Sequence, residues 1–174
     1  MTCLAGGAQP AEAAEDDRPK MQRVRSSNPL ITTLISQIVL QSKTFRALID
    51  AVNATDGIVY LEEGKCGHGV RACLVKVTMA GSNRMLWVKV DIRKADWALL
   101  ASSIGHELRH TLEVLGDRKV TDNASMYMFY LHGLGLGVGT TGTQGTFETW
   151  TAIEAGDAVL SEVRNYRTST SAPR

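Results

Sequence analysis

The spacing of apolar residues predicts a long helix over residues 96–115. Apolar side chains recur there every three to four positions, which is the repeat of one buried face of an α-helix. Asp96 is a suitable N-cap, Gly116 is a suitable stop, and no proline interrupts the segment between them. The helix therefore has a predicted core stripe, which consists of Leu100, Ile104, Leu108 and Leu115.

Helical spacing also covers residues 29–53, and the chain then changes to the two-residue repeat of strands. Strands are predicted at residues 57–62, 73–79 and 84–92, with a turn at residues 80–83. A last helix is predicted at residues 147–165. This order predicts an α+β fold in which a small, mostly antiparallel sheet packs beside the 96–115 helix.

Residues 121–145 follow neither repeat. A run rich in Met and aromatic residues at 126–131 predicts a short helix or a packed loop, and six glycines punctuate residues 133–145. These glycines do not follow a strand and open a helix, so no phosphate-binding loop is predicted. A mobile flap over a cleft and an ordinary loop are the two interpretations of this glycine-rich segment.

Residues 106–110 carry the candidate chemistry, because they read His-Glu-Leu-Arg-His. With 3.6 residues per helical turn, His106 and His110 lie one above the other, so both imidazoles can reach one metal ion. The pair is typical of zinc, and one zinc ion is the expected cofactor. Glu107 is the predicted catalytic residue, a general base that accepts a proton from the attacking water. The motif thus predicts a zinc-dependent hydrolase.

A hydrolytic zinc ion usually has three protein ligands, so a third ligand is needed. Glu148 is the favoured candidate, because a later helix presents it from a different direction than the histidines. Glu113 shares the face of the histidines and is better placed to accept a hydrogen bond from a histidine N–H or an arginine. His132, in the connecting segment, is another candidate. Tyr127 and Tyr130 are candidate oxyanion donors, with core packing as the alternative.

These motifs resemble those of the glutamate-type zincin metallopeptidases, and are more similar to a set of small bacterial proteins of uncharacterised function. The resemblance covers about residues 25–166. It is carried by residues 105–114, Phe147-Glu148-Thr149, the helical segment 152–160, Arg25-Ser26-Ser27, and Val59-Tyr60 with Cys66 and Cys73. It implies a minimal zincin-like domain with a metallopeptidase site. In that layout an edge strand above the metal pairs with an extended peptide or protein substrate.

Composition limits the other function classes. The 174 residues suffice for one domain, and they include 19 Lys and Arg against 18 Asp and Glu. A net charge near zero does not favour nucleic acid or an anionic membrane surface as a partner. No apolar run reaches the roughly 18 residues of a transmembrane helix. A zinc peptidase is therefore the favoured function, and a non-catalytic accessory domain with a structural or vestigial zinc site is the alternative.

The chain ends and the cysteines bear on location. Residues 1–24 are predicted to be a leader or a disordered N-terminus, and residues 167–174 a disordered tail. Cys66 and Cys73 flank a glycine-rich turn between two predicted strands, so they are close enough to form a disulfide. A disulfide favours an extracytoplasmic protein, either periplasmic or secreted. The alternative is a cytoplasmic protein in which both thiols are free and buried.

Overall fold

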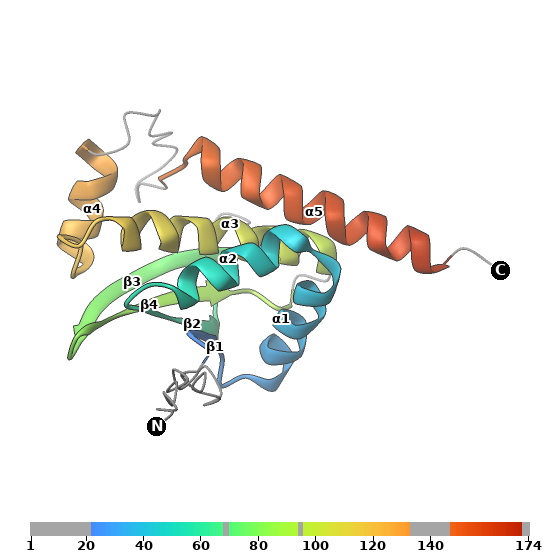
Figure 1. Ribbon diagram of the computed structural model, residues 1–174, viewed down its shortest axis with the longest axis horizontal. Helices are drawn as coiled ribbons and strands as arrows, with labels where there is room; N and C mark the ends of the chain where they lie inside the picture. The colour runs from blue at the N-terminus through green and yellow to red at the C-terminus, as the bar shows by residue number, and fades with distance from the viewer. Residues whose placement is uncertain (1–21, 68–69, 94–95, 133–146, 172–174) are drawn as a thin grey trace, which may run out of the picture.

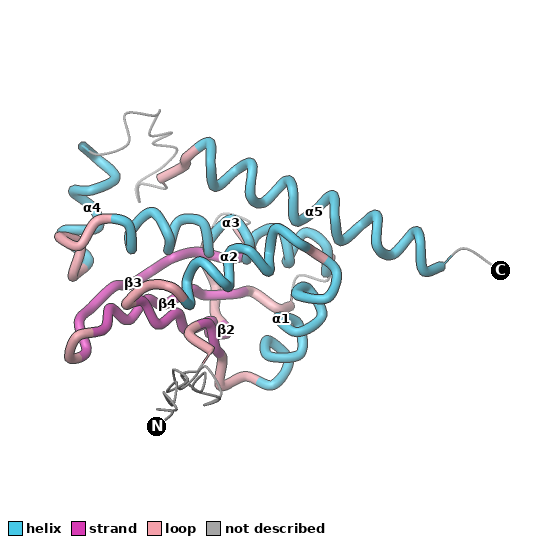
Figure 2. Tube along the Cα trace, in the orientation of Figure 1, coloured by secondary structure: helices cyan, strands magenta, loops and turns pink. Residues whose placement is uncertain are grey.

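A four-stranded sheet, helices on one of its faces and an outer helix make up the fold (Figure 1). The computed structural model describes residues 22–67, 70–93, 96–132 and 147–171. The elements are β1 (Val24–Arg25), α1 (Pro29–Gln41), α2 (Lys43–Asn53), β2 (Gly57–Glu63), β3 (Ala72–Ala80), β4 (Asn83–Val90), α3 (Trp97–Gly116), α4 (Asn123–His132) and α5 (Trp150–Ser171). α2 and α3 lie between the sheet and α5 (Figure 2). The fold is α+β, as the sequence predicts.

The sheet is mixed, with the strand order β1-β2-β4-β3. β2 pairs in parallel with β1 and with β4, and β3 pairs antiparallel with β4. The prediction of a mostly antiparallel sheet is therefore wrong for the described strands. It assumes that consecutive strands pair, whereas β4 inserts between β2 and β3. Burial accounts for this insertion, because every second side chain of β4 is buried in the core, namely Arg84, Leu86, Val88 and Val90.

The connections beside β4 contain the predicted turn and the predicted disulfide. Gly81, with a φ of 62°, lies in the two-residue turn that returns β3 into β4. To reach β3 from β2, the chain passes the end of β4, where the Gly64 N–H donates to a β4 carbonyl at 3.0 Å. Cys66 and Cys73 form a disulfide there, with 5.8 Å between their Cα atoms. The bridge therefore closes a crossover connection and not a hairpin between paired strands.

One face of the sheet is formed by the residues that alternate with the buried ones. A row of side chains crosses all four strands on this face. Arg25, Tyr60, Trp87 and Lys76 are direct neighbours in the strand register. The Tyr60 and Trp87 rings stack with their centroids 5.9 Å apart. Arg25 lies 5.5 Å from the Tyr60 centroid, and Lys76 lies 4.6 Å from that of Trp87. Cross-strand contacts of this kind contribute about 0.2–1 kcal/mol each to the stability of a sheet.

Both ends of the described chain extend the predicted boundaries. The Arg23 side chain donates to the Gly57 carbonyl at 3.3 Å, and β1 begins at Val24, so the chain joins the sheet before residue 25. α5 continues to Ser171, and residues 167–171 are therefore helical where a disordered tail is predicted. Residues 1–21 of the segment predicted to be a leader or a disordered N-terminus, and the glycine-rich segment 133–145, lie outside the described residues.

The helical segment predicted at residues 29–53 consists of two helices that meet at Ser42. The Ser42 side chain accepts a hydrogen bond from the Phe45 N–H at 2.9 Å and so caps α2. Its hydroxyl donates in turn to Glu162 of α5 at 2.6 Å, and the same carboxylate accepts the Thr44 N–H at 3.0 Å. A carboxylate on α5 therefore accepts the hydrogen bonds donated at the N-terminus of α2.

A buried arginine fastens the sheet to the end of α3. Arg84 on β4 is 1% exposed, and its guanidinium donates to Asp56 at 2.7 Å. The same group donates to the carbonyls of Val114 at 3.0 Å, Leu115 at 2.7 Å and Asp117 at 2.7 Å. Carbonyls in the last turn of a helix lack a partner within the helix, and Arg84 donates to those at the end of α3. The carbonyls of Val114 and Asp117 also accept the N–H groups of Asp117 and Val120. This contact fixes α3 relative to β4.

Candidate metal centre

α3 presents both histidines of the candidate site. Asp96 accepts a hydrogen bond from the Leu99 N–H at 3.0 Å and caps the helix, as predicted. The four residues of the predicted core stripe are all buried. The His106 and His110 side chains lie on another face of α3, beside the segment that leads into α5. His110 and Glu107 are themselves buried.

His106, His110 and Glu148 bring three ligand atoms together. The Nε2 atoms of the two histidines are 3.0 Å apart, and Glu148 Oε2 is 3.3 Å from His106 Nε2. All three ligand atoms lie within 4.8 Å of one another. Ligand atoms around a tetrahedral zinc ion with bonds of about 2.0–2.1 Å are separated by about 3.3 Å. The cluster therefore fits a metal ion of this size, and the half-exposed Glu148 keeps one side open to solvent.

Glu148 reaches the histidines from just outside α5. Its predicted position is on the last helix, but α5 begins two residues later, at Trp150. Thr149 caps this helix, because its hydroxyl accepts the Ala152 N–H at 3.2 Å. The helix propensities of the residues alone do not distinguish an N-cap from the first helical turn. The predicted start of the helix, at residue 147, is therefore a few residues too early. The third candidate ligand is thus held by a helix cap.

The other two candidates for the third ligand are not in the cluster. Both oxygens of Glu113 have partners, because Oε2 is 2.9 Å from His110 Nδ1 and Oε1 accepts hydrogen bonds from Thr149 and Thr151. Glu113 thus contacts the outer nitrogen of a histidine, the role for which the sequence analysis favours it. His132 is exposed at the end of α4. Among the described residues, only Glu148 joins the two histidines as a possible ligand.

Glu107 lies on the side of α3 that faces the sheet. Its Oε2 accepts the Leu74 N–H of β3 at 2.7 Å. β3 is an edge strand of the described sheet and has a register irregularity between Leu74 and Lys76. Burial raises the pKa of Glu107, while His110, His106 and the Leu74 N–H act in the opposite direction. A carboxylate with a raised pKa is closer to the range in which it accepts and releases a proton near neutrality.

The charges of the remaining cluster residues depend on one another. Burial disfavours the charged form of His106, but Glu148, Glu107 and Glu113 outweigh this and raise its pKa. The hydrogen bond with His106 is the largest of the effects that lower the pKa of Glu148. Glu113 and Glu148, whose pKa values are lowered, therefore place negative charge beside the two imidazoles, and this charge attracts a cation.

The two candidate oxyanion donors occupy different places. Tyr130 is buried, and its hydroxyl lies 3.2 Å from the His110 carbonyl, to which it donates, and 3.3 Å from His110 Nδ1. Its ring stacks on Phe147 with the centroids 4.9 Å apart. Tyr127 is half exposed and touches the edge of Phe147. Phe147 is not among the predicted site residues. Its position directly before the predicted ligand Glu148 could have indicated that it lies at the site.

Two glycines, one on each helix, allow α5 to lie close to α3. A Cβ at Gly105 would come within 2.8 Å of the Val159 side chain. A Cβ at Gly156 would come within 3.3 Å of His106 Cβ and of the Ser102 carbonyl. A close approach here lets the start of α5 hold Glu148 against His106.

Gly105→Ala is expected to destabilise the protein by about 1–3 kcal/mol, because the added methyl group forces α5 and Val159 to move. Metal affinity should fall as well, since Glu148 moves with the start of α5. Gly116→Ala is the matched control on the same helix, because a Cβ there meets nothing within 4 Å. Urea unfolding and a metal titration measure both effects. Equal stability and affinity of the two variants would contradict the close packing.

Comparisons of the chain with protein-family models, with curated proteins and with solved structures give no match. The architecture alone does not assign an activity, because one fold supports many chemistries. The function is therefore inferred from the residues of the site and from their geometry.

Proposed function

We propose that the protein is a zinc-dependent hydrolase with a zincin-like site, and that its substrates are peptides or proteins. The observation that supports this is the convergence of His106, His110 and Glu148 beside the buried carboxylate of Glu107. Two imidazoles and one carboxylate are a ligand set that catalytic zinc uses in proteins. A zinc ion held there supplies Lewis acidity, which lowers the pKa of water and polarises a carbonyl group.

Glu107 is the proton carrier in this proposal. The Leu74 N–H holds one of its oxygens, so the carboxylate has a fixed orientation on the β3 side of the histidines. Its raised pKa suits a group that accepts a proton from the attacking water and then delivers it to the leaving amine. The peptide bond breaks as the amine takes up this proton.

A structural zinc site is the competing proposal, and the donor set argues against it. Structural zinc sites usually have four protein ligands, whereas the described residues bring three together. A structural site also has no use for a buried carboxylate at Glu107, whose burial costs free energy. These two features favour a catalytic centre that keeps one coordination position for water or substrate.

We also propose that the protein works outside the cytoplasm, in the periplasm or as a secreted protein. The disulfide between Cys66 and Cys73 supports this location, because cytosolic reductants keep thiols reduced. No helix in the described parts of the chain has the length and apolar character needed to cross a membrane.

Metal analysis of the full-length protein, purified without chelator, tests the proposal. We expect about one zinc ion per chain, and loss of this zinc in the double variant His106→Ala/His110→Ala. Cleavage of a peptide library should stop on addition of a chelator and return on addition of zinc. Zinc retained by the double variant would contradict the site, and a zinc-loaded protein that cleaves no peptide would favour the structural alternative.

A further inference from the structure

The Glu113 carboxylate lies between the two parts of the metal centre. Its Oε2 is 2.9 Å from Nδ1 of His110 on α3. Its Oε1 accepts hydrogen bonds from the hydroxyls of Thr149, at 2.7 Å, and Thr151, at 2.6 Å. Thr149 directly follows Glu148 in the chain. One carboxylate therefore links the second histidine to the immediate neighbours of the third ligand.

Glu113 acts as an acceptor at both oxygens. Thr149 and Thr151 donate their hydroxyls to Oε1, and Oε2 faces His110 Nδ1. A carboxylate oxygen accepts, so a hydrogen bond at Oε2 requires the proton of His110 on Nδ1, which leaves the Nε2 lone pair for a metal ion. Arg109 Nε, 3.9 Å from Glu113 Oε1, adds a positive charge nearby.

A second contact ties the same two parts together. The Tyr130 hydroxyl donates to the His110 carbonyl at 3.2 Å, while the Tyr130 ring stacks on Phe147. The residues on both sides of Glu148, namely Phe147 and Thr149, are thus held by groups that also contact His110. Movement of His110 and movement of Glu148 are therefore linked.

We infer that Glu113 is the positioning residue of the metal centre, and that it sets the geometry of His110 and of Glu148 at the same time. It is not one of the three converging ligand residues. It keeps the two ligands at the spacing that a metal ion needs, so the centre binds metal as a preformed unit. The inference rests on the metal site of the proposed function and adds a coupling between its ligands.

Cobalt(II) is a suitable probe, because its visible absorption reports coordination geometry and its titration gives an affinity. In metal-free, full-length protein, Glu113→Gln should weaken cobalt binding by about 10- to 100-fold and change the visible spectrum, since an amide cannot accept from both sides. Thr151→Val should give a smaller loss. The double variant should lose less than the sum of the two, because both changes break one link.

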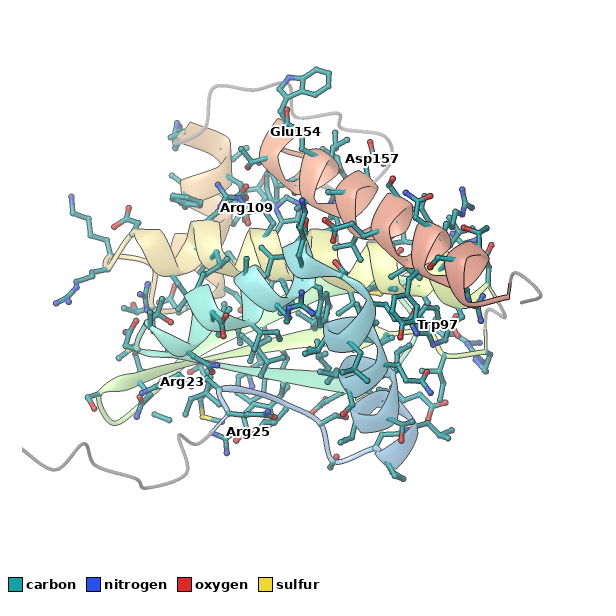
Figure 3. All side chains as sticks on the ribbon, turned by 45° about the vertical axis from the view of Figure 1, so that its right-hand side comes forward. Arg23, Arg25, Trp97, Arg109, Glu154 and Asp157 are labelled. Carbon is teal, nitrogen blue, oxygen red and sulfur yellow. A yellow bond between two sulfur atoms is a disulfide. The ribbon has the colours of Figure 1, made fainter. Side chains whose placement is uncertain are left out.

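Glu154→Gln is the matched control, because Glu154 is exposed on α5 (Figure 3). It should leave affinity and spectrum unchanged. A Glu113→Gln variant with a lower melting temperature but the wild-type cobalt affinity and spectrum would overturn the inference, since Glu113 would then act on stability alone. Wild-type protein that binds neither cobalt nor zinc would instead overturn the proposed function, and the inference with it.

Discussion

Glu107→Gln is expected to lower the rate of peptide hydrolysis by about 10²- to 10⁴-fold while zinc stays bound. An amide cannot accept the proton of the attacking water, but its oxygen can still accept the Leu74 N–H, so the side chain keeps its place. Single-turnover cleavage of a peptide from the library measures the rate, and metal analysis of the same sample measures zinc.

Glu148→Ala separates the ligand from the base. This variant should lose zinc affinity, because it removes one of the three converging ligand atoms. The assignment of roles is wrong if Glu148→Ala binds zinc normally, or if Glu107→Gln cleaves peptides at the wild-type rate. His132→Ala serves as a comparison, since His132 lies exposed at the end of α4 and should have no effect on zinc.

Arg84→Met is expected to lower the free energy of unfolding by about 3–5 kcal/mol. Methionine fills much of the same volume, but it removes the guanidinium that donates to Asp56 and to the carbonyls of Val114, Leu115 and Asp117. The carbonyls of Val114 and Asp117 keep a backbone N–H donor each. Half-exposed Asp56 can recover water, so the lower end of this range is favoured. Urea unfolding with a fixed m-value measures the loss.

Arg93→Met is the control for Arg84→Met. Arg93 also pairs with an aspartate, the buried Asp91, but the Arg93 side chain itself is 57% exposed. Water reaches this guanidinium, so its contact contributes less than the buried contacts of Arg84, and Arg93→Met should lose clearly less stability than Arg84→Met. Equal losses of unfolding free energy in the two variants would contradict a large contribution of the buried contacts between Arg84 and α3.

The parts of the fold that depend on local spacing are predictable from the sequence. The α3 helix, its Asp96 cap and its buried stripe follow from a repeat of 3.6 residues. The convergence of His106 and His110 follows from the same repeat, because four residues make about one turn. The turn at Gly81 follows from the short-range conformational freedom of glycine.

The parts that depend on contacts between distant residues are not predictable in this way. The position of β4 between β2 and β3 depends on which strand is most buried. The local repeat of apolar residues does not show which strand that is. The link from Glu113 to Thr149 and Thr151 spans 36 and 38 residues, so the two threonines have no distinguishing pattern of their own. Glu148 can be predicted as a ligand because a carboxylate is a common zinc ligand. The helix cap at Thr149, which holds Glu148 in place, cannot be predicted in this way.

The contact between Glu162 and Ser42 also orders events during synthesis. The two residues are separated by 120 positions, so Ser42 leaves the ribosome long before its acceptor exists. Until α5 emerges, the start of α2 lacks the carboxylate that receives the Ser42 hydroxyl and the Thr44 N–H. Glu148 lies two residues before α5 and is held by the cap of that helix. A nascent chain that stops short of α5 therefore lacks both the Glu162 contact at α2 and the helix that holds Glu148 near the histidines, and the docking of α5 supplies both.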